Sequence, residues 1–102
     1  DSLSLMTYQQ VVSSAPVVLV EFYATWCPHC QRMAPVVEQV TELLGEAIPT
    51  YRFDIDQDRE AASEADVNSL PTFIVYGNGE EKWRHSGEID GNVLLAKVQS
   101  FL

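Results

Sequence analysis

EFYATWCPHCQRMAP, residues 21–35, contains the only two cysteines of a 102-residue chain, and they are three positions apart. The stretch lies where an apolar, β-branched run ends and a helical pattern begins, so it predicts a strand that leads directly into a helix. A structural disulfide stabilises a protein more when it closes a long loop in the unfolded chain. Because Cys27 and Cys30 would close almost no loop, their spacing favours a chemical role over a structural one.

The composition of the chain predicts one small globular domain spanning residues 1–102. Of its 102 residues, 46% are hydrophobic, which is enough for a single core. The 15 acidic and 6 basic residues give a formal charge of −9, which disfavours binding to nucleic acid and to anionic lipid. No apolar run approaches the roughly 20 residues that span a bilayer. We therefore expect a soluble protein without membrane insertion, either cytoplasmic or, since Asp1 opens the chain, exported after removal of a leader.

Strand and helix patterns alternate along the chain. The predicted order is strand, helix, strand, helix, strand, helix, strand, strand and helix, over residues 3–5, 7–13, 17–24, 28–44, 48–55, 59–65, 72–76, 81–85 and from 91 onward. Thr7 and Asp58 are the expected N-caps of two of these helices, and Gly45 is expected to end the longest one. This alternation predicts an α/β fold with a mixed sheet that helices cover on both faces.

The start of the predicted long helix is a suitable place for a reactive thiol. Unpaired backbone amides and the helix dipole favour negative charge there, so Cys27 is the expected attacking thiolate. Cys30, one turn further along, is spaced to resolve a mixed disulfide by attacking the sulfur of Cys27. Pro28 fits the first turn, which needs few amide donors. His29 is expected to stabilise the thiolate by donating a hydrogen bond or a positive charge toward Cys27.

Glu21 is unusual because it lies within an apolar run that predicts a buried strand. By the two-residue period of a strand it shares a face with Leu19 and Tyr23, which we expect beneath the helix that carries the cysteines. A carboxyl buried there would accept the proton of Cys30, whose thiol must be deprotonated before it can resolve the intermediate. The alternative is a solvated acid at the edge of the sheet.

The chain resembles the thioredoxin-fold family, which includes thioredoxins and the catalytic domains of protein disulfide isomerases. The matching pieces, in the family's order, are VEFYATWCPHCQRMAP, the strand end DIDQD, SLPTF, the GNGE hairpin and Gly87. Together they span nearly the whole chain, and they imply a thioredoxin fold with a central mixed sheet flanked by helices. The pair between the cysteines, Pro28 and His29, differs from the Gly-Pro of thioredoxins and the Gly-His of the isomerases. It is similar to that of the periplasmic disulfide oxidases.

The resemblance implies a thiol-disulfide oxidoreductase that acts on protein disulfides or dithiols, needs no cofactor beyond its cysteine pair, and has a partner that reduces or reoxidises that pair. It also implies a cis bond before Pro71 and a backbone at Leu70 that pairs with an extended substrate segment, with Trp26 as a flat apolar contact. Arg52 falls where thioredoxin has a lysine near the buried carboxyl, so it is the expected charge or proton-transfer partner of Glu21. The Pro-His pair favours a more oxidising protein than an ordinary thioredoxin.

Other interpretations of these residues stay open. The chain could be a non-catalytic thioredoxin-like binding domain in which the cysteines form a structural disulfide. A zinc site normally needs four ligands, and besides the cysteines only His29 and His85 offer imidazole nitrogens. Asp54, Asp56 and Asp58 match the start of a calcium-binding loop, but the glycine and the final glutamate of such a loop are missing. No metal site is therefore expected, and His85 is expected to have a structural or solvent-facing role.

Overall fold

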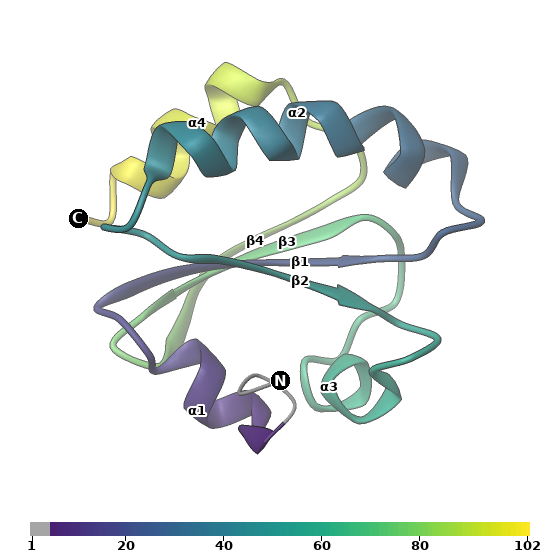
Figure 1. Cartoon of the computed structure of the whole chain (residues 1–102), viewed down its shortest axis with the longest axis horizontal. Coiled ribbons are helices and arrows are strands. Elements are labelled where there is room, and N and C mark those ends of the chain that lie inside the picture. The colour runs from purple at the N-terminus through teal and green to yellow at the C-terminus, as the bar shows by residue number, and fades with distance from the viewer. Residues whose placement is uncertain (1–4) are drawn as a thin grey trace.

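The computed structural model describes residues 5–102 as a four-stranded sheet between two pairs of helices (Figure 1). The elements are α1 (Tyr8–Val12), β1 (Val17–Tyr23), α2 (Pro28–Leu44), β2 (Thr50–Asp54), α3 (Arg59–Glu64), β3 (Thr72–Gly77), β4 (Glu80–Ser86) and α4 (Gly91–Gln99). α2 and α4 cover one face of the sheet, and α1 and α3 lie on the other. The predicted α/β class is therefore confirmed. The strand predicted at residues 3–5 lies outside the described residues except for Leu5, which is not in a strand.

The sheet has the strand order β2-β1-β3-β4. β1 pairs in parallel with β2 and antiparallel with β3, and β3 and β4 form an antiparallel hairpin. Asn78 and Gly79 connect the hairpin with φ of 52° and 82°, the left-handed backbone that a tight two-residue turn requires. Since β1 is a central strand covered on both faces, its sequence VVLVEFY is apolar almost throughout. Its carboxyl end leads directly into the start of α2 (Figure 1).

Alternate residues of β1 face two separate cores. Leu19 packs beneath α2 and α4, whereas Val20 and Phe22 face α1 and α3. Glu21 is two residues after Leu19, so its side chain lies on the same face of the strand, and it is fully buried. The strand therefore places one carboxyl in the interior on the side that α2 covers.

Most of the predicted boundaries agree with the structure to within one residue, but the start of β2 and the predicted cap of α3 do not. α2 begins at Pro28 and is followed by Gly45 with a left-handed φ of 63°, as the sequence predicted. β2 begins at Thr50 instead of residue 48, because Pro49 has no amide hydrogen to donate to a neighbouring strand. Asp58 precedes α3, but its side chain makes no capping hydrogen bond, since its φ of −112° and ψ of 55° depart from the extended backbone of a typical N-cap.

Candidate active site

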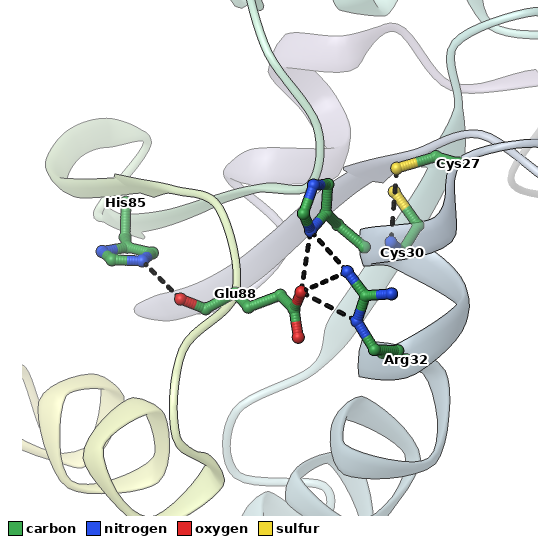
Figure 2. Close-up of polar contacts among 6 residues, drawn as sticks. Cys27, Cys30, Arg32, His85 and Glu88 are labelled. Atoms are coloured by element: carbon green, nitrogen blue, oxygen red, sulfur yellow. Dashed lines mark hydrogen bonds and ion pairs between the residues drawn. The ribbon is translucent and has the colours of Figure 1, made fainter.

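The two cysteines lie at the N-terminus of α2. Both thiols are free and largely buried, with exposed fractions of 5% for Cys27 and 2% for Cys30. Cys27 is the N-cap residue, and its Sγ accepts a hydrogen bond from the backbone amide of Cys30 over 3.3 Å (Figure 2). The sulfur of Cys27 thus accepts one of the amide hydrogens that a helix start leaves unpaired. Such a position stabilises negative charge on that sulfur.

Cys30 is in a different electrostatic environment from Cys27. Burial raises the pKa of the Cys30 thiol to about 12, and the adjacent Cys27 sulfur and the charge of Glu21 act in the same direction. Cys30 is therefore protonated near neutral pH and must lose its proton before it can act as a nucleophile. The arrangement gives the two sulfurs different chemical roles.

Glu21 and Arg52 form an ion pair on the adjacent strands β1 and β2. Arg52 Nε donates to Oε1 of Glu21 over 2.6 Å, and its guanidinium lies 4.4 Å from the ring centroid of Tyr23. Within residues 5–102, Oε2 of Glu21 is buried without a hydrogen-bond partner. Burial raises the pKa of Glu21 above its ordinary value, although Arg52 opposes this shift. The carboxyl therefore has one anchored oxygen and one oxygen able to accept a proton.

An apolar groove of about 550 Å³ lies beside Cys27. Its lining includes Trp26, Pro28, Ile55, Ala62, Val67 and Leu70. Trp26 is 62% exposed, and its indole Nε1 donates to Asp56 over 2.7 Å, which fixes the ring at the side of the groove. The peptide bond between Leu70 and Pro71 is cis. The structure thus brings Trp26 and Leu70, two residues expected to contact substrate, to the same groove as Cys27.

His29 differs from the expectation that it would donate toward Cys27. Its Nδ1 lies 2.7 Å from Oε2 of Glu88, and Arg32 donates to the same oxygen from Nε and Nη2 over 3.0 Å and 2.8 Å. Figure 2 shows the Glu88 carboxylate facing Arg32 across the start of α2. Hydrogen bonds from Arg32 and then from His29 lower the pKa of Glu88 to about 2. Nδ1 of His29 is therefore bonded to a carboxylate, which the sequence analysis did not expect.

Sequence reasoning missed both Arg32 and Glu88. A signal for Arg32 was present, because residues three apart on a helix are neighbours and Arg32 follows His29 at that spacing. Glu88 had no such signal, because it lies 59 positions after His29 in an irregular segment between β4 and α4. His85 was expected to have a structural or solvent-facing role, and its ring stacks on Trp83 with centroids 6.0 Å apart.

Residues 5–102 contain no group of three or more His, Cys, Asp or Glu side chains that could hold a metal ion. Asp54 and Asp56, which match the start of a calcium loop, make other contacts. The carboxylate of Asp54 accepts the backbone amide of Asp56 over 2.9 Å, and Asp56 accepts from Trp26. Among the same described residues, no helix is long and apolar enough to cross a membrane.

A family model described as Thioredoxin matches residues 2–100. The chain belongs to the thioredoxin family. It is 39% identical over 85 residues to the chloroplastic thioredoxin Y of Oryza sativa subsp. japonica, which covers 83% of this chain and 51% of that protein. It is 35% identical over 94 residues to a thioredoxin-like protein of Synechocystis sp., which covers 92% of this chain and 90% of that protein.

Solved thioredoxin structures have the same fold. A mutant thioredoxin from Halobacterium salinarum NRC-1 matches with a TM-score of 0.81 and 32% identity, over 91% of this chain and 80% of that one. Thioredoxin of Plasmodium falciparum matches with a TM-score of 0.82 and 26% identity, over 93% and 91% of the two chains. The present chain spans about half the length of the chloroplast thioredoxin it matches. Thioredoxins are thiol-disulfide oxidoreductases that use their own cysteines and no cofactor.

Proposed function

We propose that this chain is a thiol-disulfide oxidoreductase that exchanges disulfides with protein substrates through Cys27 and Cys30. The observation that carries the proposal is the position of Cys27. Its sulfur caps α2, accepts the amide of Cys30 and borders an apolar groove. A thiolate at that position is stabilised by the helix start and is close to a surface on which a polypeptide can lie.

The proposed reaction has two displacement steps, written here in the reducing direction. The Cys27 thiolate attacks one sulfur of a substrate disulfide, which breaks the substrate S–S bond and releases one substrate thiolate. The Cys30 thiolate then attacks the sulfur of Cys27, which breaks the mixed disulfide and releases the second substrate thiolate. Two electrons pass from the cysteine pair to the substrate, and the pair becomes a disulfide. The proton of Cys30 is removed before the second step, and the two released substrate thiolates take up protons from solvent. When the cysteine pair is a disulfide and the substrate is a dithiol, the same two steps run in reverse and the substrate is oxidised.

We assign to Glu21 the role of proton acceptor for Cys30. The thiol of Cys30 has a pKa of about 12, so without a base only a minute fraction would be thiolate near neutral pH. Oε2 of Glu21 is buried on the α2 side of the sheet with no partner among residues 5–102, and its charge acts on Cys30. In this proposal Arg52 is the charge partner that keeps the carboxyl oriented through Oε1.

The groove supports a binding mode for an extended substrate segment. The backbone of Leu70 is proposed to pair with the segment, in the manner of an added strand, while Trp26 contacts its apolar side chains. Pro71, which follows Leu70 through the cis peptide bond, is buried, and we propose that it supports the Leu70 backbone in this role. The formal charge of −9 makes protein surfaces better partners than nucleic acid or anionic membranes. The proposal also requires a second protein that reduces or reoxidises the cysteine pair.

The finer part of the proposal is that the pair is more oxidising than that of an ordinary thioredoxin. Reduction produces a thiolate on Cys27, so any group that stabilises the thiolate favours the reduced state and raises the reduction potential. Pro28 and His29 occupy the first turn of α2 directly after this sulfur, and Arg32 follows on the same face as His29. Two groups able to carry positive charge therefore lie near the helix start.

Insulin reduction by dithiothreitol tests the proposed activity. The wild-type chain should accelerate precipitation of the insulin B chain over dithiothreitol alone, and the Cys27→Ser variant should not. The alternative function, a binding domain with a structural disulfide, predicts the same rate for both proteins and for dithiothreitol alone. Equal rates would therefore reject the proposed function.

A further inference from the structure

Glu88 joins two segments that flank the cysteine pair. Its Oε2 accepts from Nε and Nη2 of Arg32 over 3.0 Å and 2.8 Å, and it lies 2.7 Å from Nδ1 of His29. Nδ1 also lies 2.8 Å from Nη2 of Arg32. A carboxylate can only accept and a guanidinium can only donate, so Nδ1 donates to Glu88 when it carries a hydrogen and accepts from Arg32 when it does not. Three nitrogen atoms from the first turns of α2 thus lie within 3.0 Å of one carboxylate oxygen in the segment that follows β4.

The backbone around Glu88 is held independently of this carboxylate. The amide of Gly87 donates to the carbonyl oxygen of Pro71 over 2.8 Å, next to the groove. Nε2 of His85 lies 3.2 Å from the carbonyl oxygen of Glu88 and donates to it, since that oxygen can only accept (Figure 2). Because these two contacts fix the segment, the Glu88 side chain is placed opposite the start of α2 by its own backbone. A change of its charge alone should therefore leave the segment in place.

The charges of this cluster act on Cys27. Glu88 is the main cause of the raised pKa of Arg32, and negative charge on Cys27 contributes in the same direction. His29 lines the same groove as Cys27, and Arg32 follows one turn later on α2, so positive charge on either side chain lies near the sulfur that carries the thiolate. The carboxylate of Glu88 compensates that charge at 2.8 Å and also holds the ring of His29.

We propose that Glu88 is a positioning residue that lowers the reduction potential of the Cys27–Cys30 pair by compensating Arg32 and by holding His29. The inference rests on the proposed oxidoreductase function and concerns the same site. With a neutral group in place of Glu88, Arg32 carries an uncompensated charge and His29 is no longer bound to an anion. The uncompensated charge of Arg32 stabilises the thiolate that reduction of the disulfide generates, and the His29 ring, released from the carboxylate, can turn toward the sulfur of Cys27. The pair therefore becomes more oxidising.

The test is a comparison of the Glu88→Gln variant with wild type by equilibration with reduced and oxidised glutathione. Glutamine keeps the size of the side chain and removes its charge. The equilibrium should shift toward the reduced cysteine pair by about two- to fivefold, the scale of one exposed charge interaction. Because the interaction is between exposed charges, most of the shift should disappear in 1 M salt.

Two further variants separate charge from structure. Glu81→Gln is a control, because Glu81 accepts from Arg84 over 2.7 Å in a partly exposed ion pair on β4, outside the contacts of the cysteine pair. It should leave the equilibrium with glutathione unchanged. Glu88→Asp keeps the carboxylate and should stay closer to wild type than Glu88→Gln does.

The outcomes distinguish this inference from the proposed function. A wild-type protein that does not exchange with glutathione would overturn both. Exchange in wild type with the same equilibrium constant in Glu88→Gln, or with a shift toward the oxidised pair, would overturn the role of Glu88 alone. A shift that persists in full in 1 M salt, or that Glu81→Gln reproduces, would also overturn it, because the effect would not come from this charge.

Discussion

Arg52 anchors one oxygen of Glu21 and leaves the other oxygen without a partner among residues 5–102. The Nε of Arg52 lies 2.6 Å from Oε1, while Oε2 is buried and unpaired. A buried carboxylate normally satisfies both oxygens, because an unpaired polar atom costs free energy. The arrangement therefore fits a group that exchanges a proton better than one that only stabilises the fold.

We predict that Glu21→Gln slows resolution of the mixed disulfide more than it slows the first attack. A positioned acid or base contributes at least about a hundredfold in typical cases, so resolution should slow by about this factor. In wild type the rate of resolution should rise with pH as Glu21 loses its proton, above the ordinary pKa of 4.5 because burial raises the pKa of this group. In the variant the slower rate should not level off above the pKa of Glu21 but should keep rising with pH, because Cys30 must lose its proton to solvent.

Resolution is measured as release of a chromogenic thiol from a preformed mixed disulfide with Cys27. Glu38→Gln is the control, because Glu38 is an exposed carboxylate on α2. A Glu21→Gln variant with wild-type resolution rates across pH 6 to 8 would rule out the proton-transfer role.

The same substitution should change how stability depends on pH. Because burial raises the pKa of Glu21, the native state binds more protons than the unfolded state at pH values above 4.5. Its contribution to stability is present below 4.5 and is lost as pH rises through the raised value. Glu21→Gln avoids this loss, so its advantage over wild type should grow with pH by about 1.4 kcal/mol for each unit of the shift.

Urea unfolding of the two reduced proteins at pH 4 and pH 8 measures this difference. A difference in unfolding free energy that is the same at both pH values would show that Glu21 titrates alike in the folded and unfolded chains.

Local patterns in the sequence predicted most of the fold, since a strand or helix that packs on a core needs apolar residues at its own period. The alternation of side chains along β1 predicted that Glu21 lies on the side of the sheet that α2 covers. The sulfur positions followed from the helix start at Pro28. These features depend on neighbours within a few positions along the chain.

The contacts that the sequence did not predict join segments far apart along the chain. The bond between His29 and Glu88 spans 59 positions, and that between Trp26 and Asp56 spans 30. Both acceptors, Asp56 and Glu88, lie outside the helices and strands, where no repeating sequence pattern indicates which way a side chain points. The prediction that His29 donates toward Cys27 considered only residues close to His29 along the chain, and a carboxylate brought in by the fold is the partner that Nδ1 has instead.

The division of roles between the sulfurs predicts different results for the two serine variants. Cys27→Ser should abolish turnover of insulin, because no attacking thiolate is left. Cys30→Ser should accumulate mixed disulfides with substrate, because the resolving sulfur is missing. Non-reducing electrophoresis followed by mass spectrometry detects the trapped species.

Since the Cys30 thiol has a pKa of about 12, alkylation of the reduced wild type at mildly acidic pH should modify Cys27 first. Faster labelling of Cys30 would reverse the assignment.

The Pro28-His29 pair should make the protein more oxidising than the same chain with the Gly-Pro pair of ordinary thioredoxins. Changing Pro28→Gly together with His29→Pro removes the imidazole from the first turn of α2 and frees Glu88 from one of its donors. Less positive charge then lies near the sulfur of Cys27, so the thiolate is less stable and the disulfide is favoured. The reduction potential should fall by tens of millivolts, where about 30 mV corresponds to a tenfold change in the equilibrium constant.

Equilibration of both proteins with glutathione measures the change in potential, and a His29→Ala variant shows how much of that change comes from loss of the imidazole. Equal potentials, or a higher potential for the Gly-Pro variant, would show that the pair does not set the oxidising character.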